Sequence, residues 1–240
     1  MKHLQETEFW EESWAQHLET YLKAPPRCGI WIQAKFGAEA APVLEIAGGS
    51  CRDACYLAKN GIVSTGSDFD EKTLEYLRHR FKNIPIHLEQ ADAGQLPFHD
   101  KSHETSFSNG FWVCYRDDEQ IKKFALEQAR VTRKWMIILV HNARNKWLVE
   151  DFARKAQTDK LYDIRFFDPH EILELVESFD LGHKTIQLGK FGGPADLFYS
   201  KRVKKLPNPF SKFAHTFVPN LYKTQSWEKT ERVACIVELD

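Results

Sequence analysis

The sequence carries almost no net charge. Lys and Arg total 33 and Asp and Glu total 34, which leaves a formal charge of −1 over 240 residues. A chain without an excess of one sign has no overall field that attracts nucleic acid or an anionic membrane. We therefore expect no nucleic-acid partner. Independently of the charge, we expect a monomer or homodimer.

Long apolar runs are also missing, and the first residues, MKHLQETEFWEESW, are acidic and interrupted. Neither a secretory signal nor a transmembrane helix has that pattern, so we expect a cytoplasmic protein with no membrane span. The five cysteines are an odd number among apolar neighbours, which is not a disulfide framework. Cys51 and Cys55 stand four residues apart without a second Cys or His pair, and no metal site is expected.

What the sequence does contain is an alternation of two apolar patterns. Strands are predicted at 43–46, 62–67, 84–89, 104–108, 135–140, 184–188 and 232–239. Helical spacing lies between them, at 4–22, in the segment after Gly49, and at 71–82, 117–131, 147–160 and 171–179. Asp168 and Pro169 have the residue types of an N-cap and a first helical position. The alternation predicts a doubly wound α/β fold with a mostly parallel seven-stranded sheet.

One domain is expected, because 240 residues with 42% hydrophobic content can form one large core. Its parts are an N-terminal helical cap over 1–40, a core over 42–188, an insertion over 189–230 and a last strand over 231–240. The insertion carries prolines and a basic, aromatic-rich cluster that includes Lys201, Arg202, Lys204, Lys205, Lys212, Phe210, Phe213 and Phe217. That cluster is either a cap for an acidic, saccharide or lipid-linked acceptor or a solvated loop with core aromatics.

A turn of small residues follows the first strand. Ala47, Gly48, Gly49 and Ser50 carry almost no side chain, so backbone N–H groups and a helix N-terminus can approach a ligand closely. Glu45 precedes the turn on the strand, and a carboxylate there favours a ligand with a positive end over a pyrophosphate. The turn therefore predicts a nucleotide-type cofactor site.

Further polar residues follow the next predicted strands, where an open parallel sheet binds its ligand. Asp68 comes 23 residues after Glu45, a spacing at which an acid on the second strand is expected to accept hydrogen bonds from ribose hydroxyls. Asp92 with Ala93 follows the third strand. Taken singly, Asp68 is alternatively a cap for the helix from Glu71, and Asp92 an ordinary turn residue.

Together these motifs resemble the class I S-adenosylmethionine-dependent methyltransferases over about Pro42 to Val140. EIAGGSC is similar to the glycine turn of that family, GSDFD to the end of its second strand, ADAGQLPF to its adenine segment, and SFSNGFW to its fourth strand and following loop. Two family glycines are replaced, the first by Ala47 and the third by Cys51, which adds bulk near the expected ligand. A dinucleotide frame, G-x-G-x-x-G, would instead require glycine at Ala47 and near Arg52.

The resemblance implies S-adenosylmethionine as cofactor and an antiparallel last strand. It implies that Glu45 orients the amino-acid end, that Asp68 holds the ribose and that Phe69 flanks the adenine. It further implies that Asp92 and Ala93 read the adenine. The remaining cofactor contacts it implies are made by Ala47, Gly48, Gly49, Asn109 and Gly110.

The acceptor side is expected around the fifth strand. His141 follows that strand directly and is the candidate general base, although a structural histidine is an equal reading. Trp112, Tyr115 and Asn142 are candidate pocket residues, with His170 a further one, and Trp10 and Trp14 are expected in a lid. The expected function is methyl transfer to a small-molecule oxygen or nitrogen acceptor. A non-catalytic protein that binds S-adenosylmethionine or S-adenosylhomocysteine, and a nicotinamide-dependent oxidoreductase, remain alternatives.

Overall fold

The structure is a computed structural model that describes residues 2–196, 217 and 220–240, without the side chains of residues 2–8, 11, 14 and 15. Its helices are α1 (Lys2–Lys23), α2 (Arg27–Phe36), α3 (Arg52–Lys59), α4 (Glu71–Arg80), α5 (Asp118–Val131), α6 (Lys146–Lys155) and α7 (Pro169–Glu177). Its strands are β1 (Val43–Ile46), β2 (Ser64–Asp68), β3 (His87–Gln90), β4 (His103–Asn109), β5 (Thr132–His141), β6 (His183–Phe191) and β7 (Arg232–Leu239). Short 3-10 turns include η2 (Trp112–Cys114) and η3 (Lys160–Tyr162).

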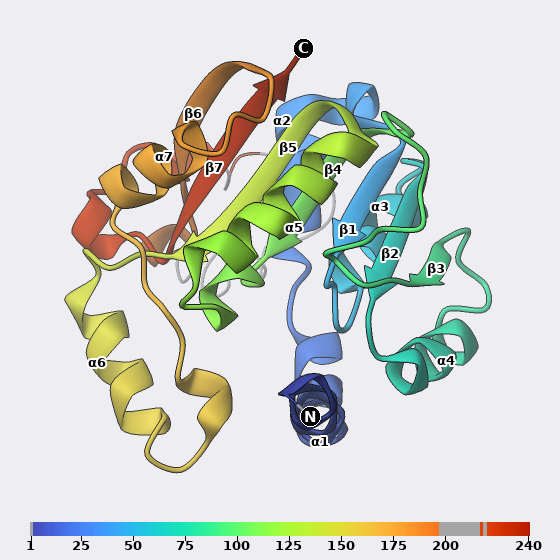
Figure 1. Ribbon diagram of the computed structural model, residues 1–240, viewed down its shortest axis with the longest axis horizontal. Coiled ribbons are helices and arrows are strands. Elements are labelled where there is room, and N and C mark those ends of the chain that lie inside the picture. Colours follow the sequence, from blue (N-terminus) through green and yellow to red (C-terminus); the bar gives the residue numbers. More distant parts are fainter. Residues whose placement is uncertain (1, 197–216, 218–219) are drawn as a thin grey trace, which may run out of the picture.

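The strands form one sheet in the order β3-β2-β1-β4-β5-β7-β6 (Figure 1). Strands β1 to β5 pair in parallel, and β7 runs antiparallel to both β5 and β6. This confirms the predicted fold, including the antiparallel last strand. Because β7 is reversed, its first residues lie at the same sheet edge as the last residues of β4 and β5.

Local sequence signals start several helices. Asp70 caps α4, Asp117 caps α5 and Asn145 caps α6, each by accepting a backbone N–H from the first turn with its side chain. At α7, Asp168 and Glu171 form a capping box with Pro169 in the first turn. The predicted start of that helix is confirmed.

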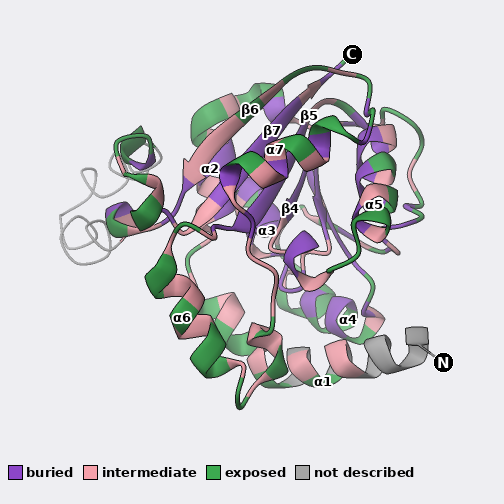
Figure 2. Cartoon of the chain, turned by 60° about the vertical axis from the view of Figure 1, so that its left-hand side comes forward, coloured by how far each residue is buried: buried purple, intermediate pink, exposed green. Residues whose placement is uncertain are grey.

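The alternating side chains of β5 supply both layers of the core. Met136, Ile138 and Val140 pack in the cluster that includes residues of α5 and α7, whereas Ile137 and Leu139 pack in the cluster that includes α2 and α3. Strands β1, β2, β4, β5 and β7 are accordingly mostly buried, while the edge strands β3 and β6 and helices α1 and α6 are largely half-buried or exposed (Figure 2). Helices α1, α4 and α6 lie at one end of the sheet (Figure 1).

Several elements differ from the sequence prediction: strands β2, β5 and β6 and helices α4 and α7 have other bounds, and three further differences have local reasons or consequences. Helix α2, which was not predicted, begins directly after Pro26 and buries Cys28, Trp31 and Ile32. Strand β3 begins at His87 and not at Ile84, because Pro85 has no N–H for the ladder. Helix α6 ends at Lys155, and 3-10 turn η3 follows.

Side-chain contacts tie α1 to distant parts of the chain. Tyr76 of α4 donates to Glu19, and His17 lies 3.0 Å from Asp159, which precedes η3. The expected lid residue Trp14 and most of the basic cluster of the insertion lie outside the described residues and side chains. Among the described helices, none is long and apolar enough to cross a membrane.

Candidate functional site

A cavity of about 310 Å³ opens at the end of the sheet where α1, α4 and α6 lie. It takes residues from the ends of β1, β2, β4 and β5, from the start of β7, and from α1, α5, α6 and η3. Of the residues predicted from the sequence, it is lined by Glu45, Ala47, Gly48, Asp68, Phe69, Asp92, Ala93, Asn109, Gly110, Tyr115, His141 and Trp10. Its volume is in the range of small-molecule sites.

The turn after β1 is held in an unusual backbone conformation. Ala47 has φ of 50° and Gly49 has φ of 53°, both in the left-handed region. A Cβ on Gly48 would lie 2.9 Å from Cys51 Sγ and 3.0 Å from Glu45 Cγ, so only glycine is accommodated there. Strain of this kind in a non-glycine residue costs roughly 1–3 kcal/mol and is concentrated at functional turns.

Cys51 does not crowd the cavity, contrary to the expectation from its bulk. Its φ of 44° turns the side chain into a buried cluster with Leu74, Leu77 and Leu88. Space for it exists because β2 has glycine at position 66, where a Cβ would come within 2.8 Å of Cys51 Sγ. The thiol is absent from the cavity wall, and burial raises its pKa, so it remains neutral.

Glu45 is a nearly fully buried carboxylate at the floor of the turn. It accepts the backbone N–H of Ala54 at 2.8 Å, which links β1 to the first turn of α3. Burial, followed by the negative field of Asp53, raises the pKa of Glu45 well above its ordinary value. A cationic ligand group beside Glu45 would favour its charged form.

Asp68, at the end of β2, reaches the glycine turn. The Gly49 N–H donates to its Oδ2 at 2.7 Å, and the Asp70 N–H donates to its Oδ1 at 3.1 Å. Burial raises the pKa of Asp68, and these hydrogen bonds oppose the shift. The cap of α4 is Asp70, so Asp68 is not that helix's N-cap. Each Asp68 oxygen keeps a second lone pair for a ligand hydroxyl.

Asp92 combines a turn role with a place on the cavity wall. Its Oδ1 accepts the Gly94 N–H at 2.7 Å, as the turn interpretation requires, and its side chain still lines the cavity. Phe69 is 45% exposed and lines the same end of the cavity, where a flat ligand ring can stack on it.

His141 stands at the end of β5 in an apolar setting. Its ring centroid is 5.0 Å from that of Phe152 and 5.6 Å from that of Phe166, and its Nδ1 has no hydrogen-bond partner among the described residues. Burial, reinforced by the nearby cation of Arg232, lowers the pKa of His141 well below its ordinary value. The imidazole is therefore neutral at neutral pH.

Three predicted pocket residues lie elsewhere, and these placements correct the sequence interpretation. Trp112 is fully buried in the core with its ring 6.3 Å from that of Phe179. Asn142 donates to the backbone oxygens of Trp227 and Thr230 and does not line the cavity. His170 is exposed on α7, 3.2 Å from Glu174. Gly49 is beside the cavity, and its N–H is used by Asp68.

The cavity also contains residues that the sequence analysis missed. Arg52 opens α3 and donates to the backbone oxygen of Tyr21, and both residues line the cavity. Phe152 and Tyr162 form an aromatic wall with ring centroids 5.2 Å apart. Arg232 enters from the start of β7, a position that the predicted antiparallel direction of the last strand could have identified.

The similarity to known proteins lies in the same core of the fold. Residues 43–134 match a family model described as a methyltransferase domain. A search of curated proteins found no match.

Three solved structures illustrate the similarity. One is an S-adenosylmethionine-dependent methyltransferase from Thermotoga maritima, a possible histamine N-methyltransferase, with a TM-score of 0.61 and 14% identity over 97% of this chain and 100% of that chain. A second is an S-adenosylmethionine-dependent methyltransferase from Archaeoglobus fulgidus, with a TM-score of 0.58 and 14% identity over 92% of this chain and 97% of that chain. The third, the magnesium protoporphyrin IX methyltransferase of Synechocystis, has a TM-score of 0.56 and 12% identity over 92% of this chain and 82% of that chain. At such identities the likeness concerns the fold.

Proposed function

Because the chain carries the domain of a class I S-adenosylmethionine-dependent methyltransferase, we propose that it methylates a small-molecule oxygen or nitrogen acceptor held in this cavity. The observation that carries the proposal is that the expected cofactor residues and the expected base line the same cavity. Glu45, Asp68 and Asp92, from the ends of β1, β2 and β3, line one cavity together with His141. Acids for a cofactor and a neutral base for an acceptor are therefore available in one space.

The residues at the glycine turn are compatible with S-adenosylmethionine. Gly48 has no side chain to collide with Cys51 or Glu45, and buried Glu45 is suited to the cofactor's ammonium group. Asp68 would hold the ribose hydroxyls, and Asp92 the adenine amino group. Arg52, whose positive field lowers the pKa of Glu45, is placed to meet the cofactor's carboxylate. The cofactor supplies an already activated methyl group.

The protein's own contribution is positioning, exclusion of water and proton acceptance. Tyr21 and Trp10 of α1, with Phe152 of α6, line the cavity and would shield the reacting atoms. His141, kept neutral by burial, would accept a proton from an acceptor that must lose one. An acceptor that is already deprotonated would not need this step.

The first test is binding and turnover with the purified chain. S-adenosylhomocysteine is expected to raise the melting temperature, whereas NAD and NADP are not. Radiolabel from methyl-labelled S-adenosylmethionine is then followed into a panel of phenols, amines and carboxylic acids. Stabilisation by the dinucleotides alone would reject the proposal. Cofactor binding without turnover on any acceptor would favour the non-catalytic binding protein.

His141→Ala distinguishes the catalytic from the structural interpretation of the histidine. We expect turnover to fall by about a hundredfold or more, the usual contribution of a positioned base, with cofactor affinity little changed. The measurement is kcat on the accepted substrate beside the dissociation constant of S-adenosylhomocysteine. Unchanged turnover would remove His141 from the mechanism.

A further inference from the structure

Arg232 brings a buried cation to the acceptor side of the cavity. It is the first residue of β7 and pairs in register with His141. Its Nη1 donates to Asn109 Oδ1, and a Cβ on Gly110 would lie 3.3 Å from that Nη1. The side chain is only 16% exposed and lines the cavity. The guanidinium thus lies across the ends of β4 and β5.

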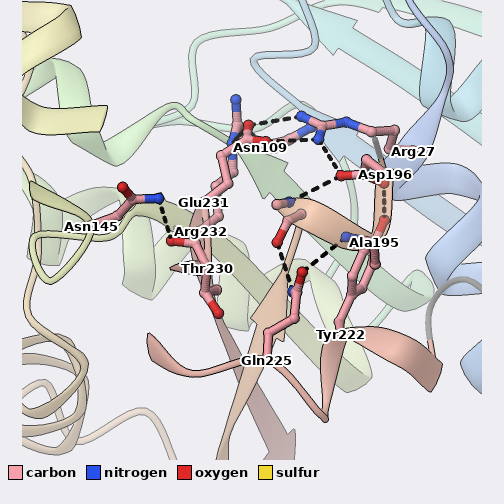
Figure 3. A network of polar contacts seen from close by, with 12 residues as sticks. Arg27, Asn109, Asn145, Ala195, Asp196, Tyr222, Gln225, Thr230, Glu231 and Arg232 are labelled. Atoms are coloured by element: carbon pink, nitrogen blue, oxygen red, sulfur yellow. Dashed lines mark hydrogen bonds and ion pairs between the residues drawn. The ribbon is translucent and has the colours of Figure 1, made fainter. Parts of the chain in front are cut away.

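The neighbouring carboxylate is already engaged by a different arginine. Arg27 donates to both oxygens of Glu231 at 2.7 Å and to Asp196 at 2.6 Å (Figure 3). Tyr222 donates to the same Asp196 at 2.6 Å. This arrangement ties Glu231 and Asp196 to Arg27, which is itself outside the cavity wall.

Arg232 is consequently left with an incompletely satisfied charge. Its Nε lies 3.5 Å from Glu231 Oε1 and has no hydrogen-bond partner among the described residues. Burial lowers the pKa of Arg232; the negative field of Glu231 opposes this shift, and the positive field of Arg27 adds to it. A buried guanidinium in this state gains from an anion that the protein itself does not supply.

The same side of the cavity offers a neutral, aromatic surrounding. His141 is uncharged, and the aromatic wall consists of Phe152 and Tyr162. The cofactor's carboxylate has a different candidate partner, because Arg52 lines the cavity at the first position of α3, directly after the glycine turn. The positive charge of Arg232, close to His141 and the aromatic wall, matches a monoanion with a flat apolar body.

We infer that Arg232 binds the carboxylate of the methyl acceptor, which is a small aromatic or similarly flat carboxylic acid. This inference rests on the proposed methyltransferase function. Pairing with the guanidinium engages the lone pairs of that carboxylate, so the methylated atom is another oxygen or nitrogen of the acceptor. Arg232 is then a residue that determines specificity, while His141 serves the proton.

The test measures binding to the complex with S-adenosylhomocysteine by calorimetry. The probes are two matched pairs, 4-hydroxybenzoate with 4-hydroxybenzamide and indole-3-acetate with indole-3-acetamide. For at least one pair, we expect the carboxylate to bind the wild type about tenfold to a hundredfold more tightly than the amide, as a charge-assisted hydrogen bond in a buried site allows.

Three variants separate recognition from folding. Arg232→Met should abolish the preference for the carboxylate, and Arg232→Lys should retain part of it. Arg130→Met is the control, since Arg130 is an arginine that lies outside the cavity and has its own acidic partners, Glu127 and Asp100. It should retain the full preference. Melting temperatures establish that each variant is folded before binding is compared.

The experiment distinguishes results that overturn the inference from a result that refutes the proposed function as well. The inference is overturned if no carboxylate binds in preference to its amide, or if folded Arg232→Met keeps the preference. It is also overturned if Arg232→Met weakens S-adenosylhomocysteine binding and leaves the preference intact, because Arg232 would then serve the cofactor. Failure of the wild type to bind S-adenosylhomocysteine, seen in the first titration, would refute the proposed function and this inference with it.

Discussion

The buried, neutral imidazole of His141 predicts a specific loss of stability in acid. Below its ordinary pKa the histidine of the unfolded chain takes up a proton, while the native one does not, because burial and Arg232 hold its native pKa well below that value. The unfolded state then binds more protons than the native state. Stability contributed by this group is therefore complete above a pH of about 6.5 and declines as the pH falls toward the native pKa.

The size of this loss in the free energy of unfolding follows from the uptake of one proton by His141 in the unfolded chain. With an unfolded value of about 6.5 and a native value far below it, moving from about pH 7.5 to about pH 5.5 lowers the free energy of unfolding by about 1.3 kcal/mol. Other groups add to the measured change. His103, whose pKa burial also lowers, acts in the same direction, whereas Glu45 and Asp68, with raised pKa values, act in the opposite one.

His141→Gln isolates the contribution of this one imidazole. Glutamine retains a polar side chain of similar reach but does not titrate. We expect wild type to lose about 1.3 kcal/mol more than the variant between these two pH values, in urea unfolding followed by tryptophan fluorescence. An equal loss in both proteins would refute the reasoning, because it would mean that His141 titrates alike in the native and unfolded chains.

Two further predictions concern the cofactor end. Asp68→Asn should raise the dissociation constant of S-adenosylhomocysteine about tenfold to a hundredfold, because a charged hydrogen-bond acceptor is lost. Calorimetry measures this constant. Asp117→Asn, at the N-cap of α5, is the control that should leave the constant unchanged. Gly66→Ala should cost about 1–3 kcal/mol through overpacking against Cys51, and adding Cys51→Gly should relieve that cost. Simple additivity of the two unfolding energies would contradict the packing argument.

Much of the cofactor side was readable from the sequence, for a topological reason. Strands that run parallel end at the same sheet edge, so a residue's place directly after a predicted strand is enough to locate it. Asp68 and Asp92 line the cavity as that rule requires. The exact start of β3 depends on Pro85, which lies two residues before the strand and has no N–H for the ladder.

Side-chain direction was harder to read than position along the chain. Trp112 lies closer to the end of β4 than Tyr115 does, yet η2 turns Trp112 into the core and leaves Tyr115 on the cavity wall. Cys51 replaces an expected glycine, and its left-handed backbone directs the thiol away from the ligand. Such directions depend on which tertiary neighbour leaves space, here Gly66 for Cys51.

By itself the sequence determined the α/β alternation, the glycine turn and the acids at the strand ends, because local periodicity and short spacing encode them. Only the tertiary structure decided what faces the acceptor. Arg232 reaches His141 and Asn109 because β7 returns antiparallel between β5 and β6, and Arg27, far away in the sequence, engages Glu231 beside it. Contacts between segments so distant in the chain arise from the packing of the whole sheet, which no local pattern specifies.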